Sequence, residues 1–219
     1  MRYSKDTINA TLKIMKHFKY FFVFFVLFSV PVYAASDHAI AELTQLLNRF
    51  STFSAQFTQT TMGARGEVIQ TSHGTVMIAR PGKFRWETNA PTHQIVITNG
   101  DTVWVYDVDL AQATKQTVQN SGFNPAKLLS GDTSDLLKSF MITAQSQSQA
   151  ITFTLIPRDH NAPFRKITMT FKNNLLQSMR IQTNVSQTNE FTFSHVALNP
   201  SLSRALFIFH APSGTEVLK

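Results

Sequence analysis

The sequence predicts a mainly β fold, an antiparallel meander of about ten strands with one helix before it and two short helices inserted midway. Many short segments alternate apolar and polar side chains, as strands with one buried face do. Asn99-Gly100 joins two of these segments, and this pair favours a hairpin because both residues tolerate positive φ. A sheet of about ten strands curls strongly. Helices with one apolar face would then cap its open mouth and leave a lined cavity.

The N-terminal 34 residues have the pattern of a cleaved secretion signal. Lysines at positions 13, 16 and 19 precede an almost wholly apolar run, residues 20–30, and small residues follow up to Ala34 and Ala35. The run has about a dozen residues, fewer than the roughly 20 that a membrane-spanning helix needs. We expect residues 1–34 to be removed and residues 35–219 to form a single domain. An uncleaved anchor is the alternative, and the mature N-terminus would decide between them.

Charge and cysteine content narrow the function classes. Residues 1–34 hold five of the 20 basic residues and one of the 13 acidic residues, so the mature part has a net charge of +3. This weak charge, without a run of basic side chains, does not favour a nucleic-acid partner. The chain has no cysteine, so it forms no disulfide and lacks the residue that would be lipid-modified behind a signal. We therefore expect a soluble protein of the cell envelope.

The mature chain begins with a predicted helix followed by a predicted strand. Residues 37–50 favour a helix, because their large apolar side chains recur at three- and four-residue spacings and form one stripe. Residues 52–61 favour a strand, because Phe53 and Phe57 lie on one side and polar residues on the other.

A group of six strands is expected next. They are residues 67–71, 75–79, 83–88, 94–98, 102–107 and 111–118. Ser72-His73-Gly74 would form a turn between the first two. The large side chains of the following strands, namely Phe84, Trp86, Trp104 and Tyr106, are expected to lie on a single face of the sheet.

Two helices and five further strands complete the prediction. Residues 124–131 favour one helical turn, with Asn as the cap, Pro at the first position and Gly as the stop. Residues 132–140 favour a second short helix whose inner face carries Leu136, Leu137 and Phe140. The last strands are residues 151–156, 166–171, 176–183, 190–198 and 206–209.

Several short motifs occur in a fixed order over nearly the whole mature chain. They are Phe53-Ser-Ala-Gln-Phe-Thr-Gln59, Gly74, Arg80-Pro81-x-x-Phe84-x-Trp86, Asn99-Gly100-x-x-x-Trp104-x-Tyr106, Gln112-Ala113-Thr114 and Pro125-Ala126-x-Leu128-Leu129. Together they resemble the periplasmic outer-membrane lipoprotein carrier family, LolA. The sister family, the outer-membrane receptor LolB, has a similar fold but carries a lipid-attachment cysteine, so the absence of cysteine favours the soluble carrier.

The resemblance implies an incomplete, half-closed antiparallel β-barrel of about ten to eleven strands, with a lid of three helices over a hydrophobic cavity. It implies a monomeric periplasmic chaperone that takes acylated lipoproteins from an inner-membrane transporter of the LolCDE type. The chaperone would shield the acyl chains and deliver the cargo to an outer-membrane receptor of the LolB type. A binding module of the same fold for another lipid or glycolipid is the alternative.

The resemblance also assigns candidate site residues. Arg80 would lie at the cavity mouth and act as the lid gate, and its five donors could bond to carbonyls at helix ends in the lid. Candidates for the cargo cavity or the transporter contact are Phe84, Trp86, Trp104, Tyr106, Phe53 and Phe57, of which Phe84 is implicated in meeting the transporter. Candidates for the inner face of the lid are Leu128, Leu129, Leu136, Leu137 and Phe140. Ordinary sheet core and helix packing are the alternatives for these two groups, and a solvated arginine at the end of a strand is the alternative for Arg80.

Catalytic motifs are absent from the sequence. It contains no Gly-x-Ser-x-Gly, no phosphate-binding loop and no Gly-x-Gly-x-x-Gly. The mature histidines are scattered and form no i, i+4 pair that would suit zinc. We therefore expect neither an enzyme nor a cofactor or metal site.

Overall fold

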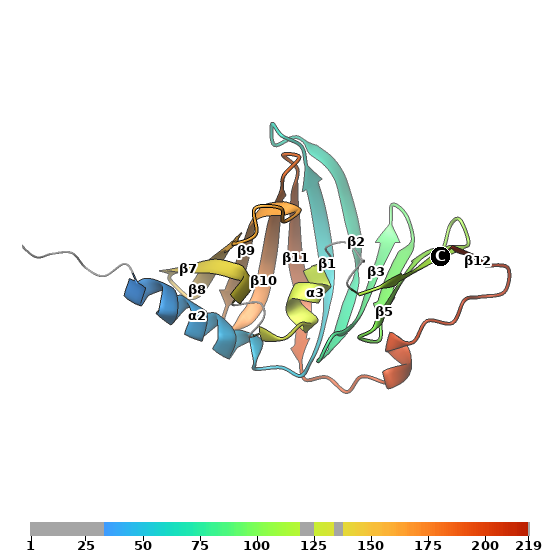
Figure 1. The fold of residues 1–219 in the computed structure, drawn as a ribbon, viewed down its shortest axis with the longest axis horizontal. Helices are drawn as coiled ribbons and strands as arrows, with labels where there is room; N and C mark the ends of the chain where they lie inside the picture. Colours follow the sequence, from blue (N-terminus) through green and yellow to red (C-terminus); the bar gives the residue numbers. More distant parts are fainter. Residues whose placement is uncertain (1–32, 119–124, 134–137, 219) are drawn as a thin grey trace, which may run out of the picture. The chain divides into compact units, whose positions relative to one another are not determined.

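One continuous sheet forms the frame of the protein (Figure 1). The computed structural model describes residues 33–118, 125–133 and 138–218. Within these residues twelve strands follow the order β12-β6-β5-β4-β3-β2-β1-β11-β10-β9-β8-β7. Neighbouring strands are antiparallel, except that β12 runs parallel to β6. Because β12 and β7 stand at opposite ends of this order, the described sheet is open, and the predicted incomplete barrel is confirmed.

The strands match most of the predicted segments. Their number is one or two above the ten to eleven strands that the resemblance implies for the barrel. They are β1 (Thr52–Met62), β2 (Val68–Ala79), β3 (Lys83–Ala90), β4 (Gln94–Thr98), β5 (Thr102–Asp107), β6 (Gln112–Thr117), β7 (Phe140–Gln147), β8 (Ala150–Pro157), β9 (Phe164–Lys172), β10 (Leu175–Thr183), β11 (Thr188–Leu198) and β12 (Glu216–Leu218).

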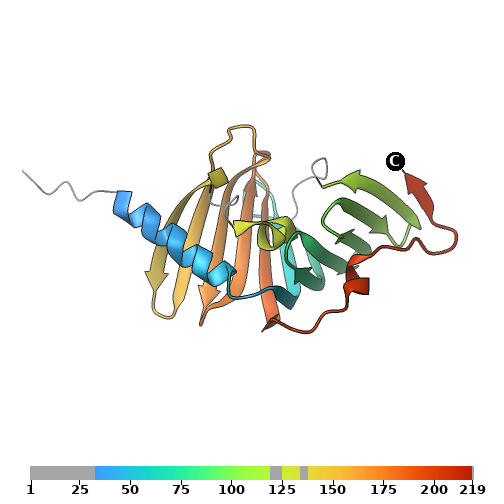
Figure 2. The ribbon, with the colours of Figure 1, turned by 60° about the horizontal axis from the view of Figure 1, so that its bottom comes forward.

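Two α-helices in the described residues lie on one face of the sheet, which we call the inner face (Figure 2). Helix α2 (Tyr33–Leu47) packs against β7, and helix α3 (Pro125–Ser130) packs against β2 and β3. Helix α2 starts and ends earlier than the predicted 37–50. Two alanines with high helix propensity extend its start, and the Arg49 N–H bonds to the Leu46 carbonyl at 3.4 Å, a three-residue spacing typical of a helix end. None of the described helices is long and apolar enough to cross a membrane.

The hydrophobic core lies between the inner face and the two helices. Helix α2 contributes Leu43 and Leu47, which are almost fully buried, and α3 contributes Leu129. The sheet contributes mainly aromatic and branched side chains. These include Phe53, Ile78, Phe84, Phe153, Leu155, Ile167, Met169 and Met179. The stripe of helix α2 and the alternation of the strands therefore meet in one core, as both patterns predict.

The predicted turn at residues 72–74 is wrong, because β2 runs through it without interruption. Gly74 stands directly opposite Phe57 in the ladder. A Cβ on this glycine would lie 2.6 Å from Cζ of the Phe57 ring and would also collide with the Glu87 carbonyl oxygen. The glycine thus marks a close approach within a strand rather than a turn.

Two predictions for the later part of the chain also change. Phe140 begins strand β7 instead of ending a helix, and Leu136 and Leu137 lie outside the described residues. Residues 206–209 do not form a strand, since a short 3-10 helix, η1 (Arg204–Phe207), ends there and buries Phe207. The polar second half of β7 and the short β12 gave no clear alternation, so the pattern did not predict either strand.

Candidate functional site

A cluster of aromatic rings from β1, β3 and β11 lies on the inner face. The Phe57 ring centroid lies 4.3 Å from that of Trp86, and Trp86 lies 5.3 Å from Phe191. Towards the helices, Phe53 meets Phe193 at 6.3 Å. All five side chains are buried. Because aromatic pairs at these separations attract one another through offset and edge contacts, the cluster forms a continuous apolar surface.

Next to this cluster lies a cavity of about 410 Å³. Its apolar lining comes from Trp86 and Phe191 of the cluster, together with Val96, Phe164 and Ile181. The size and the apolar lining are typical of a site for a small amphiphilic ligand. We call it the inner cavity.

Four of the predicted cavity candidates lie on the inner face, but only one of them is part of the described cavity lining. Trp86 lines the inner cavity, whereas Phe53, Phe57 and Phe84 pack in the core around it. Phe84 is 1% exposed, so in this conformation its ring is not accessible to a partner protein.

Trp104 and Tyr106 lie on the opposite face, which we call the outer face, and the expectation of a single face is wrong for them. Directly opposed residues in a ladder share a face. Trp104 pairs with Ile97, and Ile97 pairs with Arg85, a residue between the inward-facing Phe84 and Trp86. Both outer rings pack on Phe209, with centroids at 5.0 and 5.4 Å. The C-terminal segment after β11 therefore covers these two residues, away from the inner cavity.

Arg80 joins the loop between β2 and β3 to the end of α3. Its Nε and Nη2 atoms donate to the Leu129 carbonyl oxygen at 2.9 and 2.7 Å. The Gly82 N–H donates to the neighbouring Ser130 carbonyl at 2.9 Å. These carbonyls belong to the last turn of a helix, where backbone acceptors have no partner within the helix. The arrangement agrees with the expectation that Arg80 bonds to a helix end.

The same guanidinium reaches α2 through a short relay. Nη1 of Arg80 lies 3.4 Å from the Thr133 hydroxyl, which in turn donates to the Asn48 side-chain oxygen at 2.9 Å. The guanidinium carbon also lies 4.4 Å from the centre of the Phe50 ring. Burial lowers the pKa of Arg80, and the charge of Asp132 opposes this effect. Arginine stays charged at neutral pH despite such a shift, so the contacts keep their ionic character.

A second pocket, of about 500 Å³, lies beside this arginine. It is lined by Thr44, Asn48, Arg80, Pro81, Gly131, Asp132 and Thr133. Because α2, the β2–β3 loop and the residues directly after α3 all contribute to it, it lies at the junction that Arg80 holds together. The predicted lid residues Leu128 and Leu129 are buried beside this junction.

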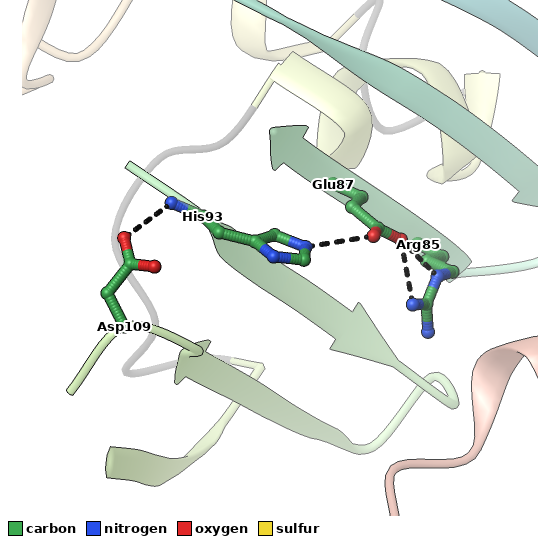
Figure 3. A network of polar contacts seen from close by, with 4 residues as sticks. All are labelled: Arg85, Glu87, His93 and Asp109. Atoms are coloured by element: carbon green, nitrogen blue, oxygen red, sulfur yellow. Dashed lines mark hydrogen bonds and ion pairs between the residues drawn. The ribbon is translucent and has the colours of Figure 1, made fainter. Parts of the chain in front are cut away.

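A polar network on the outer face of β3 was not predicted (Figure 3). Arg85 and His93 both contact the Glu87 carboxylate, at 2.8 and 3.0 Å, and the His93 N–H donates to Asp109 at 2.9 Å. Burial raises the pKa of Glu87, but the hydrogen bonds and charges of Arg85 and His93 outweigh it and hold this pKa below its ordinary value. The Arg-x-Glu spacing within a strand was the available signal, since it places both side chains on one face.

The described residues contain no group of histidine, aspartate and glutamate that could hold a metal ion. The lining of the inner cavity offers apolar surface and uncharged hydrogen-bonding groups.

Comparison with known proteins places this geometry in context. A family model described as "Outer membrane lipoprotein carrier protein LolA" matches residues 48–210. An outer-membrane lipoprotein carrier protein from Coxiella burnetii is 46% identical over 196 residues, covering 88% of this chain and 93% of that protein. One from Azotobacter vinelandii is 35% identical and covers 94% of this chain and 100% of that protein.

Among solved structures, an uncharacterized conserved protein from Thermus thermophilus matches with a TM-score of 0.53 at 10% identity. The match covers 84% of this chain and 98% of that chain. At this identity the likeness supports the fold alone.

Proposed function

The chain belongs to the LolA family of outer membrane lipoprotein carrier proteins, and from this premise we propose the following function. It is a soluble periplasmic chaperone that carries acylated lipoproteins. It accepts them from an inner-membrane transporter of the LolCDE type and delivers them to an outer-membrane receptor of the LolB type.

The observation that carries the proposal is the inner cavity beside the aromatic cluster. A chain of about 15 methylenes gains roughly 12 kcal/mol on leaving water, at about 0.8 kcal/mol per methylene. A lipoprotein therefore does not cross an aqueous space unless another apolar surface shields its chains. Trp86, Phe191 and Ile181 give the inner cavity an apolar surface of this kind. In this proposal the acyl chains of the cargo bind there without any covalent step and are shielded from water.

Arg80 is the gate of the lid in this proposal. Its bonds to Leu129 hold α3 against the β2–β3 loop. Its contact with the Thr133 hydroxyl, which donates to Asn48 directly after α2, connects α2 to the same junction. Opening this junction would separate the buried Leu128 and Leu129 from the sheet and enlarge the apolar surface available to acyl chains. The contacts of Arg80 in this junction are non-covalent, so they can break and form again without a source of chemical energy.

A release assay tests the function. Purified residues 35–219 are added to spheroplasts that carry a labelled outer-membrane lipoprotein, and the soluble fraction is analysed for a complex of the two proteins. We expect release of the acylated lipoprotein and none of a control whose lipid-attachment cysteine is replaced. Release of both forms, or of neither, contradicts the proposal. If neither is released but the protein binds a hydrophobic dye, the cavity serves another amphiphile.

A further inference from the structure

The inner face changes from apolar to polar on five strands, at positions that are staggered from strand to strand along the ladders. Moving towards the tip of the β1–β2 hairpin, each strand replaces an apolar residue by a polar one two positions away. The pairs are Phe57 and Gln59 on β1, Trp86 and Thr88 on β3, Val96 and Gln94 on β4, Ile181 and Thr183 on β10, and Phe191 and Asn189 on β11. The five polar residues all line the inner cavity. We call them the polar collar.

The polar collar carries no charge. Its members are two glutamines, one asparagine and two threonines, and the rest of the described cavity lining is apolar. An amphiphile whose chain lies against Trp86 and Phe191 would place the first polar atoms of its head at the level of the collar. Those atoms would meet amide and hydroxyl groups but no ammonium, guanidinium or carboxylate.

Hydrogen bonds hold two amide side chains of the collar, those of Gln59 and Asn189. Asn189 Oδ1 accepts from Gln59 Nε2 at 3.2 Å and from the Thr61 hydroxyl at 2.8 Å. Within the described residues, the Asn189 side-chain nitrogen and the Gln59 side-chain oxygen have no hydrogen-bond partner. The site therefore offers donors at Asn189 and an acceptor at Gln59, both held in place by the bonds of the other atom of the same amide.

We propose that the polar collar binds the uncharged ester and amide groups that join acyl chains to the cargo, and that it selects neutral-headed amphiphiles over anionic phospholipids. This inference rests on the proposed function and names the cargo class of that same cavity. An ester carbonyl accepts from Asn189, and an amide N–H donates to Gln59. A phosphate at the same place would lose part of its hydration without gaining a cation, which disfavours it.

Two single-chain lipids with the same acyl chain test the selection. Monopalmitoylglycerol has a neutral ester head, and palmitoyl-lysophosphatidylglycerol adds a phosphate. Both are titrated, below the concentrations at which they form micelles, against a hydrophobic dye bound to residues 35–219. We expect the neutral lipid to displace the dye at a concentration at least tenfold lower.

Variants of the collar locate the preference. Asn189→Leu keeps the volume of the side chain and removes the donors, so we expect the preference for the neutral lipid to fall below threefold. Gln94→Lys adds a cation at an exposed collar position and should shift the preference towards the anionic lipid. Thr192→Val, on the exposed outer side of β11, is the matched control and should behave as wild type.

The results separate the two proposals. Equal displacement by both lipids in the wild type, or a Gln94→Lys variant with unchanged preference, overturns the collar inference whatever the release assay shows. If Asn189→Leu fails to fold, the exposed Gln94→Lys change still decides the question. A clear lipid preference together with no lipoprotein release would instead keep the collar and contradict the carrier function.

Discussion

Replacing Arg80 by leucine should loosen α3 without unfolding the sheet. The change removes two hydrogen bonds from a charged donor to the Leu129 carbonyl, at 2.9 and 2.7 Å, and the contact of the guanidinium with the Phe50 ring at 4.4 Å. Bonds to charged groups contribute roughly 1.5–3 kcal/mol, and a cation–π contact about 0.5–1 kcal/mol. Both bonds end on the same carbonyl oxygen, the guanidinium is only part-buried and so is screened by water, and leucine keeps some apolar contact with Phe50. We therefore expect a net loss of about 2 kcal/mol at the junction.

This loss corresponds to a roughly 30-fold larger population of molecules with α3 detached. Amide hydrogen exchange measures that population, because exchange at locally opened sites follows the local opening free energy. The informative amides are Gly82, bonded to the Ser130 carbonyl, and Gly131, bonded to the Lys127 carbonyl. In the Arg80→Leu variant we expect their protection to fall about 30-fold, while amides in the centre of β10 keep theirs.

Two further variants sharpen the test. Arg80→Lys keeps the charge but loses the planar fork of donors, so its exchange rates should fall between those of the wild type and the leucine variant. Arg49→Leu changes a nearby exposed arginine and serves as the matched control. Unchanged protection at Gly82 and Gly131 in Arg80→Leu, or normal transfer of cargo from that variant to a receptor, would refute the gate.

Three other predictions concern the sheet. Gly74→Ala should lower the free energy of unfolding by about 2 kcal/mol or more, measured by urea denaturation, because its Cβ would collide with Phe57; a Thr75→Ala variant of normal stability is the control, and an equally stable Gly74→Ala would contradict the close approach. The pKa of Glu87 is lower in the folded protein, so its contribution to stability is present above its ordinary pKa of 4.5 and is lost as the pH falls through the folded value. The difference in free energy of unfolding between the wild type and Glu87→Gln should therefore shrink on acidification from pH 6 to pH 3. A constant difference would argue against the network. In a Trp104→Phe variant, cargo or dye should change the fluorescence of the remaining Trp86, since Trp86 lines the inner cavity and Trp104 does not. In a Trp86→Phe variant, the fluorescence of the remaining Trp104 should not change. The reverse result would place the ligand on the outer face.

The meander could be predicted from local signals because, apart from β1–β11 and β12–β6, every strand pairs with a strand next to it in the sequence. The strands on either side of Asn99-Gly100, residues 94–98 and 102–107, have the predicted bounds in the structure. The same alternation could not tell which face of the sheet each strand buries. The pairing of Thr98 with Val103 turns Trp104 outward, and Phe209, which is far away in the sequence, makes that outer position apolar.

The candidate site was predicted only in part, for a similar reason. Arg80 next to a proline and Trp86 in an apolar strand stood out in the sequence, and the structure places both at the edges of the core. Gln59 and Asn189 carried no signal alone, because each is one of several polar residues in its strand. They become a site only when the β1–β11 ladder brings them together.

The position of β1 between β2 and β11 has a consequence for the order of folding. Its contacts with β2 connect neighbouring parts of the chain, whereas the bond from the Ser51 N–H to the Asn199 side chain connects residues 148 positions apart. Contacts of such long range form slowly, because a long loop must close first. Strands β1 to β6 can therefore assemble as an early half, whose apolar edge at β1 stays uncovered until β11 arrives. During that interval the partly folded protein exposes apolar surface and is prone to aggregation. The rate at which β11 pairs with β1 therefore sets how long it remains prone to aggregation.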